Sequence, residues 1–382
     1  MHTAHRTHGF TESVIRGMSR LASAHRAINL AQGFPNFPCP DILKEEAARA
    51  IREDLNQYAI TWGSKHLRTA VARKYADWYA LEVDPDEEVT ITCGATEAMA
   101  STLLALVDPG EEVIVFEPFY ENYGPDAVLC GAAPVYVPIS PQGPLPLDRL
   151  AAAFTPRTRA IVVNTPSNPT GRVLTRAEQE GIAALCVRNG VYAVTDEIYE
   201  HIVFDGEHVP LATLPGMRER TVTISGASKT FAITGWRIGS IVAPPPLTAA
   251  IRKVHDFLTV GAPAPLQEAV AVALEQLDDD YYAGMAAAYR RRRDLLVAAL
   301  GRAGFRCTPP QGAYYVLADY SGLSDLDDVA FAQELVVAHG VATVPASSFY
   351  ASTDPARRLV RFAFCKTEEV LEEAARRLAF HR

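Results

Sequence analysis

The segment Thr223-Ile-Ser-Gly-Ala-Ser-Lys-Thr-Phe-Ala-Ile-Thr-Gly-Trp-Arg-Ile-Gly239 carries the strongest structural signal in this sequence. It places one lysine, Lys229, among small and apolar residues, with Arg237 eight positions later. Lysine is almost never fully buried unless it is paired or functional. In apolar surroundings its pKa falls, and the free amine can attack a carbonyl group. The alternative is a lysine that extends from a strand end to water, and this segment alone leaves both interpretations open.

Apolar strands and helices alternate on both sides of this segment. The predicted strands around it cover residues 89–94, 112–116, 134–138, 159–164, 191–199, 222–225 and 238–243. Such alternation predicts a mostly parallel sheet that is covered by helices on both faces. Ligands of these sheets bind at the carboxyl ends of the strands. The clusters that contain Gly94, Asn168, Asp196 and Lys229 all fall at such ends.

The pattern changes near residue 285. Strands at 312–318, 341–345 and 359–364 then alternate with helices at 327–339 and at the end of the chain. We therefore predict an α/β fold with a large domain at residues 40–284 and a smaller α+β domain formed by residues 1–39 plus 285–382. A long helix is expected from about 279 to 303, and its run Arg290-Arg-Arg-Arg293 is interpreted as a solvated helix face.

Composition narrows the class of function. The 382 residues are 48% hydrophobic and 21% charged, which is typical of a soluble globular protein with a large core. The net charge of −9 argues against nucleic acid or an anionic membrane as the main partner. The six cysteines form no CxxC pair, no signal peptide is recognisable, and no run of 18 apolar residues exists, so we expect a cytoplasmic protein without a membrane span.

Three weaker signals in the sequence also bear on function. His2, His5 and His8 recur every three residues, which fits either metal binding or a mobile tail, and we predict no metal site. No GxGxxG motif follows a strand, which disfavours a nicotinamide dehydrogenase. A transcription regulator built on the same fold needs a DNA-binding domain before Ile28, and the residues there are too few to form one.

The residues at the strand ends match the chemical needs of pyridoxal phosphate. This cofactor needs a lysine for its aldehyde, an anion pocket, a carboxylate at its ring nitrogen and donors to its phenolate oxygen. These needs are met, in that order, by Lys229; by the turn Gly94–Thr96 with Arg237; by Asp196; and by Asn168 with Tyr199. The turn presents free backbone N–H groups at a helix start, where an anion can bind. The same sequence also fits an ordinary capped turn that binds no anion. Gly33 similarly fits either a close approach to a ligand or a plain turn.

Three segments carry a specific resemblance. They are Ser225-Gly-Ala-Ser-Lys-Thr-Phe-Ala-Ile-Thr-Gly-Trp-Arg-Ile-Gly239, Asn164-Thr-Pro-Ser-Asn-Pro-Thr-Gly171 and Asp196-Glu-Ile-Tyr-Glu-His201. They resemble the hallmark segments of fold-type I pyridoxal-phosphate aminotransferases of classes I/II. The resemblance runs from Ile28-Asn-Leu-Ala-Gln-Gly-Phe-Pro-Asn-Phe to Val360-Arg-Phe-Ala-Phe-Cys. It is greatest to the kynurenine/glutamine and methionine aminotransferase branch, which shares the Gln-Gly-Phe-Pro and Asn-Gln-Tyr motifs.

This resemblance implies roles for single residues. Lys229 would form the Schiff base and move the substrate proton, Asp196 would pair with the pyridine nitrogen, and Tyr199 and Asn168 would bond the phenolate oxygen. The phosphate would be held by Gly94, Ala95, Thr96 and Arg237, and by Tyr58 of the partner subunit in a homodimer with active sites at the interface. From the Phe119-Tyr120 pair, Tyr120 is favoured to stack on the ring.

Two further implications concern the substrate and the phosphate. Arg361 would bind the substrate α-carboxylate through a bidentate fork, with Gly33 and Asn168 nearby. Many relatives carry a phosphate-binding serine three residues before the lysine, where this chain has Gly226. The residues that remain to replace its hydroxyl are Ser225, Ser228 and Thr96.

The implied activity is a ping-pong transfer of an amino group from an L-amino acid to a 2-oxo acid. Tyr58, Trp62, Tyr120, Tyr123 and Phe349 favour a substrate with an apolar or aromatic side chain, such as an aromatic amino acid, methionine, glutamine or kynurenine. No second arginine is recognisable for a side-chain carboxylate. A C–S β-lyase, or an aspartate or N-succinyldiaminopimelate aminotransferase, remains the alternative.

Overall fold

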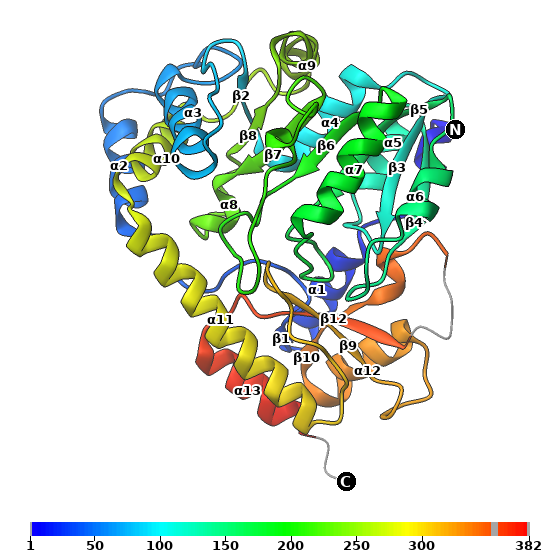
Figure 1. Cartoon of the computed structure of the whole chain (residues 1–382). Coiled ribbons are helices and arrows are strands. Elements are labelled where there is room, and N and C mark those ends of the chain that lie inside the picture. Colours follow the sequence, from blue (N-terminus) through cyan, green and yellow to red (C-terminus); the bar gives the residue numbers. More distant parts are fainter. Residues whose placement is uncertain (1, 353–357, 380–382) are drawn as a thin grey trace.

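The computed structural model describes residues 2–352 and 358–379. It has two bodies, an upper one around a large sheet and a lower one around a smaller sheet, and the long helix α11 (Asp279–Arg302) runs between them (Figure 1). The prediction of an α/β fold with a mostly parallel main sheet is confirmed.

The large sheet has seven strands in the order β2-β8-β7-β6-β5-β3-β4. Strand β8 is antiparallel to both of its neighbours, and the other adjacent pairs are parallel. The carboxyl ends of β2, β5, β6 and β7 therefore meet at one edge. The strands are β2 (Val89–Thr92), β3 (Glu112–Glu117), β4 (Ala133–Pro138), β5 (Thr158–Asn164), β6 (Tyr192–Asp196), β7 (Thr221–Gly226) and β8 (Gly239–Val242).

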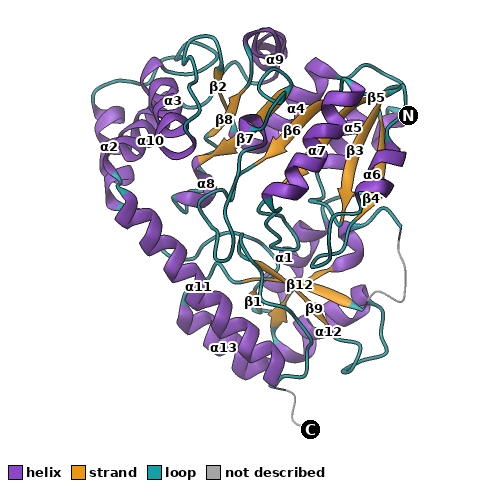
Figure 2. Ribbon diagram, viewed as in Figure 1, coloured by secondary structure: helices purple, strands orange, loops and turns teal. Residues whose placement is uncertain are grey.

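Helices cover both faces of this sheet, and the strand β3 shows why. Successive side chains of a strand point to opposite faces. Val113 and Val115 pack into one apolar cluster with helices α4 and α9, whereas Ile114 and Phe116 pack into another with α6 and α7. Figure 2 shows the strands enclosed between helices. The helices of this body are α2 (Asp41–Arg52), α3 (Lys65–Tyr79), α4 (Gly94–Leu106), α5 (Tyr123–Leu129), α6 (Leu147–Ala153), α7 (Arg176–Asn189), α8 (Ala227–Thr230), α9 (Pro245–Leu258), α10 (Ala264–Gln276) and the 3-10 turn η2 (Leu211–Thr213).

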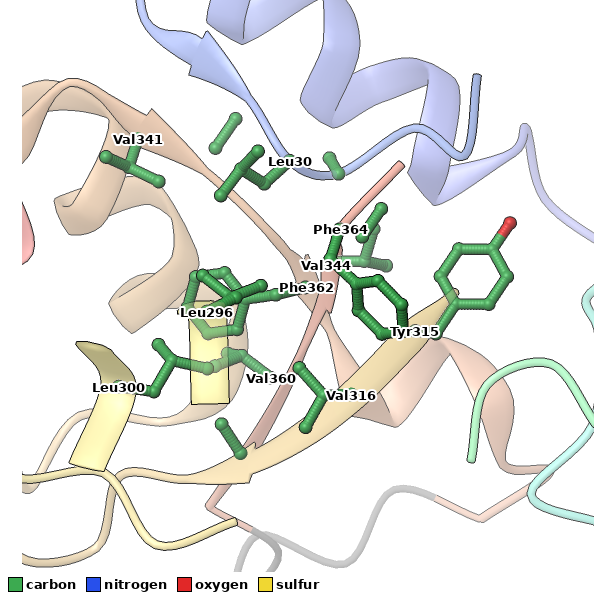
Figure 3. Close-up of a cluster of buried hydrophobic side chains, with 14 of the residues drawn as sticks. Leu30, Leu296, Leu300, Tyr315, Val316, Val341, Val344, Val360, Phe362 and Phe364 are labelled. Carbon is green, nitrogen blue, oxygen red and sulfur yellow. The ribbon is translucent and has the colours of Figure 1, made fainter. Parts of the chain in front are cut away.

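The smaller body draws on both ends of the chain. Its antiparallel sheet has the order β11-β12-β9, and β1 pairs in parallel with β10. Leu30 from the N-terminal part packs with Phe362 and Phe364 in one cluster (Figure 3). Its elements are α1 (Val14–Ala24), β1 (Ile28–Asn29), β9 (Tyr315–Asp319), α12 (Asp328–His339), β10 (Val341–Ala342), β11 (Val344–Pro345), η3 (Ala346–Phe349), β12 (Leu359–Ala363) and α13 (Glu368–Leu378). The short η1 (His5–His8) lies instead against the large body, where Arg6 donates to the Leu129 carbonyl.

The expected solvated face on α11 was only partly right. Arg293 is buried, its Nη1 lies 2.7 Å from Asp205 Oδ2, and its guanidinium lies over the ring of Phe204. One arginine of the run therefore anchors α11 to a loop of the large body. The predicted domain boundary between residues 284 and 285 lies inside this continuous helix. Among the described residues, no helix combines the length and the apolar character that a membrane span needs.

Candidate active site

Lys229 lies just beyond the carboxyl end of β7, in the single-turn helix α8. Its side chain is half-buried, and no carboxylate of the described residues lies within ion-pair distance of its amine. Burial lowers the pKa of Lys229 to about 8. The nearest aromatic rings belong to Tyr314 and Tyr199, whose centroids lie 5.9 and 6.0 Å from Nζ. A lysine with these surroundings holds a useful fraction of neutral, nucleophilic amine near neutral pH.

Asp196 ends the neighbouring strand β6, where it is in register with Ile224 of β7. Its Oδ2 accepts a hydrogen bond from Tyr123 Oη at 2.7 Å, and its Oδ1 accepts one from the Ile198 N–H at 3.3 Å. Burial raises the pKa of Asp196, and the Tyr123 bond opposes that rise. Asn164 of β5 donates from Nδ2 to the Asp196 carbonyl at 2.8 Å. This carboxylate is therefore fixed in place and suited to pair with a buried cation.

Tyr123 takes a different place from the one we expected. The sequence placed it in a wall of the substrate pocket, but it is buried and its hydroxyl binds Asp196. Of the neighbouring pair, Phe119 stacks on Tyr136 within the apolar core, with ring centroids 5.0 Å apart. Tyr120 is only half-buried and lies edge-on to Tyr123. Tyr120 is thus the member of the pair with a face available at the site.

The turn between β2 and α4 forms a cradle with Arg237. Gly94 has φ +81, and a Cβ at this position would lie 2.3 Å from Arg237 Nη2. A Cβ at Gly239 would lie 2.5 Å from the Gly94 carbonyl carbon, so both positions require glycine. Arg237 is exposed, donates to the Thr234 carbonyl, and has no carboxylate of the described residues within ion-pair distance. A helix start and a guanidinium without an acidic partner together favour an anion.

Gly226 has no room for the serine that many relatives carry. A Cβ there would lie 2.8 Å from the Ile238 carbonyl oxygen and 2.9 Å from the Gly239 Cα. Ser225 donates its hydroxyl to Glu200 and is therefore committed elsewhere. Ser228 is buried, whereas Thr96 is exposed in the first turn of α4, beside half-buried Ala95. Of the three hydroxyls that we considered, Thr96 is the best placed for an anion at the cradle.

Arg361 of β12 is fully buried although it carries a charge. Its Nη1 donates to Asn168 Oδ1 at 2.7 Å and its Nη2 donates to the Ala31 carbonyl at 2.6 Å, while Nε finds no partner in the described part of the chain. The guanidinium lies 4.2 Å from the ring centroid of Tyr315 and 4.8 Å from that of Phe349. No carboxylate of the described residues neutralises it. A buried guanidinium in this state is suited to bind the carboxylate of a ligand.

Tyr199 and Gly33 both lie next to Tyr315, whose ring packs against this arginine. Tyr199 is buried, and its hydroxyl oxygen lies 3.1 Å from that of Tyr315. The Gly33 carbonyl accepts a hydrogen bond from Tyr314 Oη at 2.9 Å. A Cβ at Gly33 would lie 1.9 Å from Tyr315 Oη, so this position also requires glycine.

The structure therefore brings most of the predicted residues to one edge of the large sheet. Tyr58 is the exception, because it is 87% exposed and forms no hydrogen bond with any residue that the structure describes. Trp62 packs under the guanidinium of Arg252. Sequence reasoning missed Asn164, Glu200 and Tyr315. The paired tyrosines after Gly312 were visible as a strand, but nothing in the sequence indicated that one of them reaches Tyr199.

Comparison with known proteins assigns this arrangement to a family. The model of the aminotransferase class I and II family matches residues 25–378. The chain belongs to this family. It is an aminotransferase that depends on pyridoxal phosphate, as the sequence predicted.

Several relatives span almost the whole chain. This aminotransferase is 42% identical to a probable N-succinyldiaminopimelate aminotransferase of Mycobacterium tuberculosis, over 99% of this chain and 98% of the relative. The solved structure of the N-succinyldiaminopimelate aminotransferase from that species superposes with a TM-score of 0.96 and 99% coverage of both chains. The methionine aminotransferase of Escherichia coli is 39% identical over 96% of this chain and 95% of its own. Human kynurenine–oxoglutarate transaminase 1 is 36% identical over 92% of each chain.

The residues of this site fit pyridoxal phosphate. The cradle at Gly94 excludes a Cβ and carries an unneutralised guanidinium, which suits a phosphate. Asp196 is a buried carboxylate that a hydrogen bond from Tyr123 helps to keep ionised, which suits a protonated ring nitrogen. Lys229 has a lowered pKa, which suits an aldehyde.

Proposed function

We propose that this aminotransferase acts on L-amino acids with an aromatic, apolar or long neutral side chain, such as methionine, glutamine, kynurenine or an aromatic amino acid. The observation that supports this choice best is the setting of Arg361. Its guanidinium is held by Asn168 and flanked by the rings of Tyr315 and Phe349. The Arg361 guanidinium can bind one carboxylate, and the side chains beside it, Tyr315 and Phe349, are aromatic.

The geometry supports the following residue roles. Lys229 would hold the cofactor aldehyde and then carry the proton that leaves the substrate α-carbon. Asp196 would pair with the ring nitrogen, with Tyr123 and Asn164 fixing its position. When bound, pyridoxal phosphate supplies an electron-withdrawing ring that stabilises negative charge at the substrate α-carbon.

The remaining groups position the cofactor and the substrate. Tyr199 would donate to the phenolate oxygen, and Asn168 has its Nδ2 left for the same oxygen because its Oδ1 accepts from Arg361. Gly94, Ala95, Thr96 and Arg237 would hold the phosphate, and Tyr120 would cover the ring. Arg361 would bind the substrate α-carboxylate beside Gly33.

N-succinyldiaminopimelate is the second candidate substrate. It is supported by the 42% identity to the M. tuberculosis protein over nearly the full length of both chains. A C–S β-lyase remains a further alternative, because the same residues also serve elimination.

Half-reactions decide between these substrates. The holoenzyme is mixed with single amino acids, and the rate of the change in cofactor absorbance is recorded in a stopped-flow instrument. The panel contains methionine, glutamine, kynurenine, phenylalanine, glutamate and aspartate, and the reverse reaction is run with the oxo form of N-succinyldiaminopimelate. Rates at least tenfold higher for the neutral side chains support the proposal, and a preference for the succinylated or acidic compounds contradicts it.

A separate assay tests for the C–S β-lyase. It measures the release of pyruvate and ammonia from a cysteine conjugate in the absence of an oxo acid.

We further propose a homodimer with active sites at the interface. Exposed apolar side chains occur on two neighbouring segments, with Tyr58 at 87% and Phe257 at 94% exposure. His255 holds these segments together, because its Nε2 donates to the Thr61 carbonyl at 2.8 Å. Tyr58 would then reach the phosphate of the partner subunit. Light scattering should give twice the monomer mass, and Phe257→Asp should lower it.

We also propose a cytoplasmic location, which the six well-separated free cysteines support.

A further inference from the structure

Tyr315 lies where the cofactor side and the substrate side of the site meet. It begins strand β9 and is buried, at 3% exposure. Figure 3 shows its ring at the edge of the apolar cluster of the smaller body, with the hydroxyl directed away from the other labelled side chains. That hydroxyl lies 3.1 Å from Tyr199 Oη, and the centroid of the ring lies 4.2 Å from the Arg361 guanidinium carbon.

The surroundings fix the Tyr315 hydroxyl in place. A Cβ at residue 33 would lie 1.9 Å from Tyr315 Oη, so Gly33 leaves the space that the hydroxyl fills. The rings of Tyr314 and Tyr315 are 4.9 Å apart, and Tyr314 is itself held by its bond to the Gly33 carbonyl. The phenol therefore has little freedom to turn to another acceptor.

Counting protons gives the direction of the hydrogen bond. Burial raises the pKa of Tyr199 and that of Tyr315, so both phenols keep their single proton at neutral pH. A phenol donates one hydrogen bond but can also accept. If Tyr199 donates to a phenolate oxygen, as the proposed function requires, it has no proton left for Tyr315. Tyr315 must then donate to Tyr199, which reverses the bond seen in this structure, where the Tyr199 hydroxyl donates to Tyr315 Oη.

We propose that Tyr315 is a positioning residue that donates a hydrogen bond to Tyr199 and thereby orients and strengthens the donation of Tyr199 to the cofactor phenolate oxygen. This inference rests on the proposed role of Tyr199. Each phenol in such a chain polarises the next, which strengthens the terminal bond. The ring of Tyr315 has a separate task, because it packs against Arg361 and helps to hold the substrate carboxylate site.

The test is a spectroscopic pH titration of the holoenzyme. The bound cofactor changes its absorbance when it loses a proton. In the deprotonated form no nearby positive charge balances the negative charge of the phenolate oxygen, so a hydrogen bond donated to that oxygen stabilises this form. Tyr315→Phe keeps the ring and removes only the hydroxyl, so the pH midpoint of the absorbance change should rise by about half a pH unit. Tyr199→Phe should raise it further. Tyr320→Phe is the matched control, because it removes another buried phenol just after β9 whose hydroxyl binds the Leu326 carbonyl.

A double-mutant cycle separates the inference from the function on which it rests. If Tyr315 acts through Tyr199, the double variant should have the midpoint of Tyr199→Phe alone. Additive shifts, or an unchanged midpoint in Tyr315→Phe while Tyr199→Phe shifts it, overturn the inference and leave the role of Tyr199 intact. An unchanged midpoint in Tyr199→Phe contradicts the proposed function itself and the inference with it.

Steady-state kinetics tests the two parts of the side chain. Tyr315→Phe should lower kcat a few-fold and leave KM for the amino acid within about twofold, because the ring still packs against Arg361. Tyr315→Leu removes the ring and should also raise KM. A rise in KM in the Phe variant, with kcat unchanged, contradicts the proposed action through Tyr199.

Discussion

Replacing Lys229 with methionine should stabilise the cofactor-free chain. The side chain is half-buried, forms no ion pair with any residue that the structure describes, and has a pKa that burial lowers from 10.5 to about 8. That difference corresponds to about 3 kcal/mol of cost for keeping the charged amine in the folded state. Partial exposure makes this an upper value. Methionine has a similar length and no charge, so the variant should gain up to about 3 kcal/mol in free energy of unfolding.

The stability difference between Lys229→Met and the wild type should depend on pH. Because the folded pKa lies below the unfolded one, the cost is complete below about pH 8 and disappears as the pH rises toward 10.5. The variant should therefore exceed the wild type most at pH 7, and the difference should shrink by pH 9.5.

The assay is urea unfolding of both cofactor-free proteins at several pH values and one fixed protein concentration. Lys253→Met is the control, because Lys253 is exposed on α9. It should show no such gain. A Lys229→Met protein that is less stable than wild type at pH 7, or a difference that does not change with pH, would refute the reasoning about Lys229.

Three further outcomes are expected. Tyr123→Phe removes the 2.7 Å bond to Asp196, worth about 1.5–3 kcal/mol, so cofactor should dissociate about tenfold more readily in a fluorescence titration; unchanged affinity argues against this role. Arg361→Lys removes the guanidinium that can donate two parallel hydrogen bonds to the substrate α-carboxylate, so KM should rise about 100-fold for every amino acid while the holoenzyme spectrum stays unchanged. A rise in KM for one substrate only contradicts this role. Burial opposes protonation of His66, but Glu268 and Glu275 outweigh it and raise its pKa. The two glutamates therefore stabilise the folded chain through protonated His66. This stabilisation is complete below the ordinary histidine pKa and is lost as pH rises through the raised pKa of His66, so His66→Gln should lower Tm at pH 5.5 but not at pH 8.5.

The sequence predicted the large sheet well because its strands are buried on both faces. Residues such as Val113 and Ile114 face opposite clusters, and a continuous apolar run is the signature of that state. The chemistry-bearing residues were found for the same reason. Asp196 and Lys229 stand directly after such runs, and parallel strands bring their carboxyl ends to one edge.

What the sequence could not give depends on contacts between distant segments. Arg293 reads as part of a charged helix face, yet it is buried because a loop residue, Asp205, reaches it from the large body. Tyr123 reads as a pocket aromatic, yet its hydroxyl meets Asp196 from 73 positions away in the chain. The position of Tyr315 beside Tyr199 arises from the meeting of the two bodies, which no local pattern records.

The covalent attachment of the cofactor tests the central claim most directly. Borohydride reduction of the full-length holoenzyme fixes the cofactor to the amine that holds it, and peptide mapping by mass spectrometry identifies that amine. We predict modification of Lys229, with loss of the visible absorbance and of turnover in Lys229→Ala. Modification of another lysine, such as buried Lys366, or a Lys229→Ala protein that keeps both absorbance and turnover, would contradict the account.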